Sequence, residues 1–209
     1  MKRANWLIAL CFICFNCSVL FAQTKADIFG GTADITWLGI DFTQAKFIGT
    51  ATQFKESGEI TSSEFRDKYI PSWNQLFLEE QKKYNVADAV KRAEVKYAMD
   101  VTEKANNGIK GNFFSNDPND YKKLDEQKIA NLVKNYDFQG KSGIGLIFFI
   151  DGMSKAKDEA SGWVTFVDMK TKKVLLTEYK TGKAGGFGFK NYWAKSFLNM
   201  LKATEKMKS

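Results

Sequence analysis

Two nearly continuous apolar runs stand out along the chain. Ile35–Ile40 is followed directly by Asp41, and the run that begins at Gly143 ends in Asp151. Apolar runs of this length, rich in β-branched and aromatic residues, are typical of strands that are buried on both faces. Both runs therefore predict central strands, each with an aspartate at its carboxyl end.

The last third of the chain predicts a hairpin followed by a helix. The β-rich segments Trp163–Met169 and Val174–Tyr179 flank the polar residues Lys170–Lys173, a connection of hairpin length. After a glycine-rich link, apolar residues recur at helical spacing to about Lys206. The apolar stripe of this helix consists of Phe189, Trp193, Phe197, Met200 and Leu201.

The segment after the first strand predicts an interrupted helix. Thr61 and Glu64 match a capping box, and apolar residues follow at helical spacing up to about Tyr84. Pro71 interrupts this pattern, because proline lacks an N–H and disfavours a helical conformation in the residue before it. We therefore expect a kink, or two helical pieces that meet at Ile70.

The middle of the chain predicts a short helical turn, a strand and a second helix. The turn spans about residues 85–92, and the second amphipathic helix runs from about Asp120 to Tyr136. Between them, apolar and polar residues alternate, as in a strand with one face in water. The apolar positions of this alternation are Val95, Tyr97, Met99 and Val101.

These elements occur in the order β-α-β-α-β-β-β-α, which predicts an α/β fold with an α+β tendency. We expect a single sheet of about five strands, helices packed on it, and a C-terminal antiparallel meander. No linker is long enough to separate two units, so residues 23–209 are expected to form one domain.

The first 22 residues predict a secretory signal peptide. Lys2 and Arg3 precede an apolar run that ends in the small residue Ala22. An uncleaved anchor helix and a lipid attached to Cys17 are the alternatives. The run is at the short limit for a membrane span, and Cys17 lacks small residues immediately before it. We expect a mature chain that starts at Gln23 and is periplasmic, outer-envelope or secreted.

Composition removes several classes of chemistry. The chain has no histidine, so serine–histidine and cysteine–histidine nucleophiles and histidine-ligated zinc are excluded. All three cysteines lie in the predicted signal, so the mature chain has no thiol. The net charge of +7 becomes +5 when Lys2 and Arg3 are removed. The lysines are scattered, which indicates a solvated surface rather than a nucleic-acid site.

The glycine-rich link offers a candidate anion site. Lys183, Gly185, Gly186, Gly188 and Lys190 precede the last helix, where free backbone N–H groups and the helix dipole favour an anion. The segment matches neither a Walker loop nor a dinucleotide fingerprint, and we expect no cofactor. The simpler interpretation is a tight strand-to-helix crossing that needs positive φ and close packing.

Two further sets of residues are candidates for chemistry or contact. Asp41 and Asp151 would lie at one edge of the sheet if their strands are parallel neighbours, and could then hold a metal or act as acid and base. Aspartate also ends strands by accepting local backbone N–H groups. Phe113 and Phe114 lie in an Asn/Gly/Asp-rich loop, where exposed aromatic residues would mark a partner contact.

The predicted hairpin carries a resemblance. The segment Phe166–Leu176 resembles the strand, Asp-x-Lys-Thr-Gly, strand hairpin of exported α/β modules, with Lys172 in the place of the usual glycine. These modules include the curli-secretion outer-membrane component, penicillin-binding-protein activator lipoproteins and the N-terminal domain of TolB. The whole chain is similar to uncharacterised secreted proteins of Bacteroides-type bacteria, whose signals often end in Phe-Ala-Gln, as Phe21–Gln23 does here. The resemblance implies an envelope binding or assembly role and no catalytic residue.

Together these features favour an exported, non-enzymatic protein that binds an envelope protein or a small ligand. A hydrolase that uses Asp41 and Asp151, with or without a metal, is the first alternative. A binder of polyanions or lipid surfaces is the second. Membrane contact is expected only through the signal peptide or peripherally.

Overall fold

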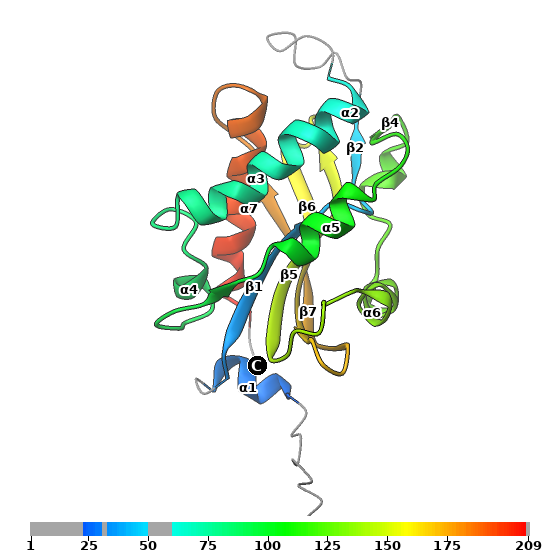
Figure 1. The fold of residues 1–209 in the computed structure, drawn as a ribbon. Helices are drawn as coiled ribbons and strands as arrows, with labels where there is room; N and C mark the ends of the chain where they lie inside the picture. The colour runs from blue at the N-terminus through cyan, green and yellow to red at the C-terminus, as the bar shows by residue number, and fades with distance from the viewer. Residues whose placement is uncertain (1–22, 31–32, 50–59, 208–209) are drawn as a thin grey trace, which may run out of the picture.

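The computed structural model describes residues 23–30, 33–49 and 60–207, and the predicted signal peptide lies outside these residues. The predicted fold class is confirmed: a mixed α/β fold in which helices surround one curled sheet (Figure 1). The strands of the described residues are β1 (Ile35–Asp41), β2 (Lys46–Ile48), β3 (Lys96–Tyr97), β4 (Phe114–Ser115), β5 (Ile144–Ser154), β6 (Glu159–Asp168) and β7 (Lys173–Lys183).

Strand β5 is the centre of the sheet. One of its edges pairs with β6 along its whole length, and its other edge pairs first with β1 and then with β2. The short strands β3 and β4 lie outside β1 and β2, respectively. The sheet is therefore about five strands wide. It is parallel on the side of β1 and β2 and becomes the predicted antiparallel meander through β5, β6 and β7.

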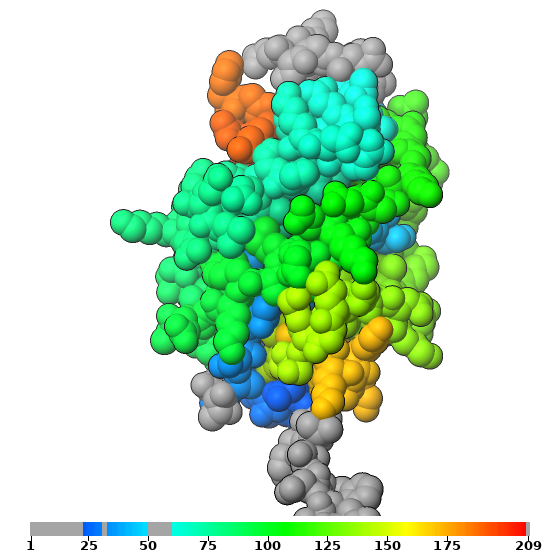
Figure 2. Space-filling view, viewed as in Figure 1, coloured from blue at the N-terminus to red at the C-terminus, as the bar shows by residue number. Residues whose placement is uncertain are grey.

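Helices cover both faces of the sheet. They are α1 (Lys25–Phe29), α2 (Ser62–Glu64), the π-helical turn η3 (Phe65–Tyr69), α3 (Ile70–Glu79), α4 (Val86–Ala89), α5 (Asp100–Asn107), the 3₁₀ turn η4 (Pro118–Tyr121), α6 (Glu126–Asn135) and α7 (Phe189–Thr204). Helices α3 and α7 pack on the larger hydrophobic cluster, and α6 packs on a second cluster across the sheet. Figure 2 shows α3 and α5 at the surface, with the loop after β7 projecting beside them.

The larger cluster is strongly aromatic. Trp37 of β1 stacks on Phe77 of α3 with ring centroids 4.7 Å apart. Phe197 of α7 is 1 % exposed and contacts Phe42 and Trp73 edge-on, at centroid distances of 5.5 and 5.3 Å. The burial of the α7 stripe that helical spacing predicts is thus confirmed.

The helix that begins at Thr61 follows the sequence closely. The Thr61 hydroxyl accepts a hydrogen bond from the Glu64 backbone N–H at 3.1 Å, as a helix cap requires. The predicted two pieces meet at Ile70, where the π-helical turn η3 passes into α3. Pro71 follows Ile70 in the first turn of α3, just after the π-helical turn. The second piece ends at Glu79 rather than Tyr84.

The predicted strand at 95–101 is largely wrong. Of these residues only Lys96 and Tyr97 pair with β1, and helix α5 starts at Asp100. The predicted helix from Asp120 to Tyr136 is likewise divided into η4 and α6. An alternation over so few residues fits a strand locally, but the outer edge of β1 needs hydrogen-bond partners that a helix supplies here.

Those partners are three buried polar side chains on α3 and α5. Thr102 donates to the Leu38 carbonyl at 2.6 Å. Asn74 accepts from the Ile40 N–H at 2.8 Å and donates to its carbonyl at 3.0 Å. Asn106 accepts from the Phe42 N–H at 2.8 Å and also donates to the Ile40 carbonyl. Side chains thus replace a neighbouring strand between β3 and β4.

This edge depends on a glycine. Leu38 is an extra residue in the pairing of β1 with β5, and Gly39 beside it has a φ of +104°. A Cβ atom on Gly39 would lie 2.4 Å from the Thr102 hydroxyl and 2.7 Å from the Asn74 side-chain oxygen. The bulge and its glycine therefore let α3 and α5 approach β1 closely.

Candidate functional site

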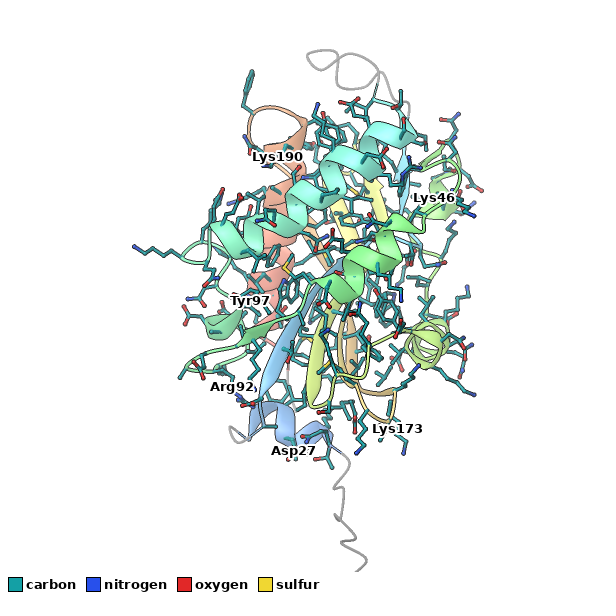
Figure 3. All side chains as sticks on the ribbon, viewed as in Figure 1. Asp27, Lys46, Arg92, Tyr97, Lys173 and Lys190 are labelled. Carbon is teal, nitrogen blue, oxygen red and sulfur yellow. The ribbon has the colours of Figure 1, made fainter. Side chains whose placement is uncertain are left out.

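The glycine-rich link forms a loop between β7 and α7. Gly186 and Gly188 have φ values of +108° and +76°, so positive φ is required at two of the three glycines predicted for an anion site. The Gly185 N–H already donates to the Tyr192 carbonyl at 3.0 Å. Lys183 donates to the Lys157 carbonyl at 3.1 Å, and Lys190 lies at the start of α7 (Figure 3). The anion site stays a prediction.

The close packing of β7 against α7 requires Gly182, a glycine outside the predicted anion site. A Cβ on Gly182, at the end of β7, would lie 2.0 Å from the Ser196 carbonyl oxygen of α7. The strand-to-helix crossing thus combines close approach at Gly182 with positive φ at Gly186 and Gly188.

The two loop phenylalanines belong mostly to the core. Phe113 is 3 % exposed and packs on Phe65 with ring centroids 4.6 Å apart, so its expected exposure is wrong. Phe114 is half-buried and contacts Phe47 of β2. The loop is polar in sequence, yet its backbone pairs with β2 and turns Phe113 inward.

Asp41 is buried at the carboxyl end of β1, where the chain turns before β2. Its Oδ1 atom accepts hydrogen bonds from the Thr43 N–H and hydroxyl at 2.7 and 2.6 Å. Its Oδ2 atom accepts from the Tyr136 hydroxyl at 2.8 Å. Burial raises the pKa of Asp41, although all three hydrogen bonds act to lower it. Asp41 is thereby hydrogen-bonded to Tyr136, the residue that directly follows α6.

Asp151 accepts hydrogen bonds from the backbone just before the N-terminus of α6. It is the extra residue of a bulge in β5, between Ile150 and Gly152. Its carboxylate accepts from the backbone N–H groups of Lys123 and Leu124 at 2.9 to 3.1 Å, just before α6 begins. Burial raises the pKa of Asp151, against the lowering effect of these N–H groups.

The two aspartates therefore lie near one another without sharing a partner. The register places Asp41 beside Phe149, two residues before Asp151. Each carboxylate is occupied by its own donors, and no group of three or more acidic residues that could hold a metal occurs in the described residues. Both aspartates therefore have a structural role, because each accepts hydrogen bonds from residues at one end of α6.

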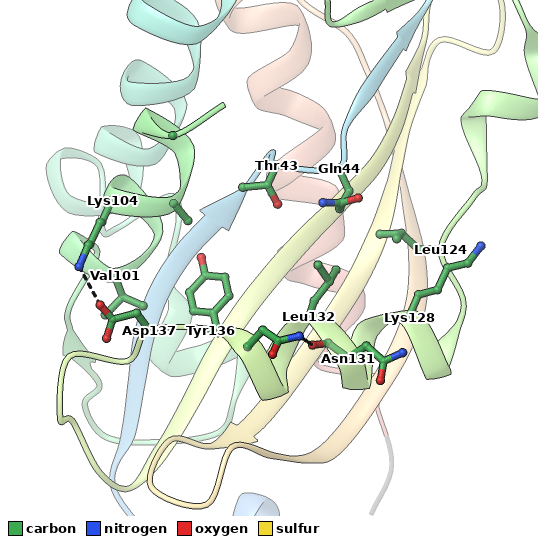
Figure 4. Close-up of a pocket in the computed structure, with 13 residues that line it drawn as sticks. Thr43, Gln44, Val101, Lys104, Leu124, Lys128, Asn131, Leu132, Tyr136 and Asp137 are labelled. Carbon is green, nitrogen blue, oxygen red and sulfur yellow. Dashed lines mark hydrogen bonds and ion pairs between the residues drawn. The ribbon is translucent and has the colours of Figure 1, made fainter. Parts of the chain in front are cut away.

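Between α5 and α6 lies an open cleft of about 660 Å³ (Figure 4). Its apolar walls come from Val101 and Ala105 of α5 and from Leu124 and Leu132 beside and on α6. Its polar lining consists of Thr43, Gln44, Lys104, Lys128, Asn131, Asn135, Tyr136 and Asp137. The cleft opens beside the carboxyl end of β1, because Thr43 and Gln44 directly follow that strand.

The charges at the cleft lie on its rim. Lys104 pairs with Asp137 at 2.7 Å, with both side chains more than half exposed. Lys128 lies 3.7 Å from Asp125 and donates to the Lys123 carbonyl at 2.5 Å. Exposed pairs of this kind contribute little to stability, so both lysines remain free to reorient toward a bound molecule.

Sequence reasoning missed this cleft for an identifiable reason. The alternation at 95–101 placed Val101 in a strand, so the helix that forms one wall was absent from the predicted fold. The sequence pattern gives Tyr136 only as the approximate end of the second predicted helix. Its position at the end of that helix is the signal that could have singled it out.

Comparison with protein-family models, curated proteins and solved structures finds no match to the chain, so its site is interpreted from its own geometry. No helix in the described residues is both long enough and apolar enough to cross a membrane.

Proposed function

We propose that this chain is an exported, non-enzymatic binding protein of the cell envelope that holds a small amphipathic ligand between α5 and α6. The observation that carries the proposal is the cleft of about 660 Å³ at the carboxyl end of β1. Its size falls within the range of small-molecule sites, and ligands of parallel α/β sheets bind outside the carboxyl ends of the strands.

Both walls of the cleft are held in place without a ligand. Thr102 and Asn106 bind α5 to the backbone of β1. Asp41 and Asp151 bind the two ends of α6, through Tyr136 and through the N–H groups before the helix. A cleft with rigid walls loses little conformational entropy when a ligand enters, which favours binding.

The lining indicates the chemistry of the ligand. Leu124, Leu132 and Ala105 offer an apolar surface, whereas Gln44 and Asn131 offer both hydrogen-bond donors and acceptors. A molecule with an apolar body and several polar groups fits this combination. Lys104 and Lys128 at the rim add a preference for a neutral or anionic group over a cationic one.

The envelope role rests on the signal-like first 22 residues and on the resemblance of the Phe166–Leu176 hairpin to exported assembly modules. Within that role, the occupied carboxylates of Asp41 and Asp151 favour binding over hydrolysis. Both side chains are engaged by internal donors, so neither is free to accept a proton from a substrate without first breaking these contacts.

The test uses a small-molecule extract of the cell envelope. Exported protein is equilibrated with the extract and separated by rapid gel filtration, and the retained compounds are identified by mass spectrometry. Ala105→Trp fills the cleft from the half-buried wall of α5. Ala203→Trp on α7 is the matched control, because Ala203 is also half-buried in a helix but lies outside the cleft.

We expect one or a few compounds to be retained by the wild type and by Ala203→Trp, and to be lost with Ala105→Trp. If the wild type retains nothing, or if Ala105→Trp retains the same compounds, the cleft is not the binding site and the proposal fails.

A further inference from the structure

One large side chain in the described residues is almost wholly in water. Phe187 is 82 % exposed, whereas Leu78, the other exposed large hydrophobic residue of this part of the chain, is 37 % exposed. Exposing a phenylalanine to this degree forgoes most of the stabilisation that its burial would give. Phe187 lies in the loop between β7 and α7, outside the helices and strands that form the core.

The loop holds Phe187 away from the body of the protein. Gly186 and Gly188, on either side of it, have positive φ. A Cβ on Gly185 or Gly188 would meet no atom within 4 Å, so the loop is not packed against neighbouring elements at these positions. Figure 2 shows this segment projecting from the surface.

Lysines surround the base of the loop. Lys183 and Lys190 flank it in sequence, and the hairpin between β5 and β6 brings Lys155 and Lys157 beside it. The hairpin is joined to the loop by the Lys183 side chain, which donates to the Lys157 carbonyl at 3.1 Å, and by the Ala184 N–H, which donates to the Asp158 carbonyl at 2.8 Å. Four lysines thus face two nearby acidic residues, Asp158 and Glu159, which pair with Lys155 and Lys183.

We propose that this end of the molecule is a peripheral membrane contact, in which Phe187 inserts into an anionic lipid surface and the surrounding lysines meet its headgroups. An aromatic ring at the lipid interface recovers the burial that it lacks in water, and basic side chains are attracted by anionic headgroups. Lysine stems can also extend along the lipid while their charges remain in the aqueous layer.

The isolation of Phe187 favours lipid over a protein partner. Aromatic anchors of protein interfaces lie within a patch of other contacts that excludes water around them. Here the neighbours of Phe187 in the loop are glycines, which have no side chains to exclude water around the ring. A lipid surface needs none, because it surrounds an inserted ring by itself.

The test measures partitioning of the exported protein onto vesicles, with its N-terminus verified by intact mass. Vesicles of equal parts phosphatidylcholine and phosphatidylglycerol are compared with vesicles of phosphatidylcholine alone. Phe187→Ala removes the ring and Phe187→Leu keeps an apolar side chain. Leu78→Ala is the matched control, since it removes the other exposed large hydrophobic side chain of the described residues, which lies on α3 and outside the loop.

We expect binding to the anionic vesicles only. Phe187→Ala should weaken it about tenfold, the scale of burying one large apolar side chain, whereas Phe187→Leu and Leu78→Ala should retain it. The pair Lys183→Gln and Lys190→Gln should also weaken it, and added salt should do the same. In Phe187→Trp, brominated lipids should quench the new indole.

Three results would overturn the proposal: no binding of the wild type to anionic vesicles, equal binding by Phe187→Ala, or binding without quenching of the Phe187→Trp indole. The last would point to a protein partner as the natural contact of Phe187. The outcome is independent of the cleft, because Ala105→Trp should bind vesicles like the wild type.

Discussion

The Tyr136 hydroxyl donates a hydrogen bond of 2.8 Å to the Oδ2 atom of Asp41, across 95 residues of sequence. It joins the end of α6 to the end of β1. Burial raises the pKa of both groups, so at neutral pH the tyrosine keeps the proton that the hydrogen bond needs. This contact fixes one wall of the proposed binding cleft.

Removing that hydroxyl should therefore destabilise the protein. Tyr136→Phe takes one hydrogen-bond donor from the buried carboxyl group of Asp41, and a hydrogen bond of this kind contributes about 0.5–3 kcal/mol. We expect a loss in this range from urea unfolding at neutral pH. Tyr97→Phe is the control, because Tyr97 is also half-buried but has no hydrogen-bond partner for its hydroxyl among the described residues. Equal effects of the two substitutions would contradict the role given to Tyr136.

The burial of Asp41 predicts a pH dependence. Its folded pKa is raised above the usual value of 3.8, so the folded state takes up a proton before the unfolded state does. The contribution of Asp41 to stability therefore increases as the pH falls through this raised pKa towards 3.8. Asp41→Asn lacks this proton uptake. The stability of the wild type minus that of Asp41→Asn should grow on acidification, and a constant difference would refute the raised pKa.

The glycines of the β7–α7 crossing should differ sharply in their tolerance of alanine. Gly182→Ala would place a Cβ 2.0 Å from the Ser196 carbonyl, and such overpacking typically costs about 1–3 kcal/mol. Gly185→Ala meets no atom within 4 Å and should change stability by less than about 1 kcal/mol. Thermal unfolding of both variants compares them directly. Loss of stability in Gly185→Ala alone would show that the crossing packs differently.

The β6–β7 hairpin contains a strained lysine. Lys172 has a φ of +56°, at the position where the resembling hairpins carry glycine. Because a left-handed conformation costs a residue with a Cβ about 1–2 kcal/mol, Lys172→Gly should stabilise the protein by up to about 1 kcal/mol. Lys170→Gly, at a position outside this conformation, should be neutral or destabilising. Denaturant midpoints measure both effects. A lower midpoint for Lys172→Gly would contradict the strain.

The edge of β1 offers a matched pair of asparagines on α5. Asn106 is 3 % exposed and binds the N–H of Phe42 and the carbonyl of Ile40, whereas Asn107 is exposed. Asn106→Ala takes the acceptor from the buried Phe42 N–H and one of the two amide donors from the Ile40 carbonyl, which keeps Asn74. It should cost about 1–3 kcal/mol, while Asn107→Ala should be nearly neutral. Hydrogen exchange of the Phe42 amide should accelerate in Asn106→Ala only. An unchanged exchange rate would mean that another group protects this edge.

Local patterns in the sequence were sufficient for most of the framework. The apolar runs that end at Asp41 and Asp151 are the two central parallel strands, and the stripe of α7 is buried as its spacing predicts. The Thr61 cap and the division of the helix at Ile70 also agree with the structure. These features depend on side-chain periodicity and on backbone chemistry within a few residues, which the sequence contains in full.

The candidate site was decided by contacts between distant segments. Asp41 is hydrogen-bonded to Tyr136, Asp151 to the N–H groups before α6, and Thr102 to Leu38. In each case the two partners are 27 to 95 residues apart in the sequence. The alternation of apolar and polar residues at 95–101 is compatible with a strand or with the start of a helix. Helix α5 forms there because its side chains supply hydrogen-bond partners to the unpaired edge of β1. The same dependence on distant neighbours buries Phe113 and leaves Phe187 in water. Burial and hydrogen bonding at such positions depend on what the fold places opposite them, and no local pattern carries that information.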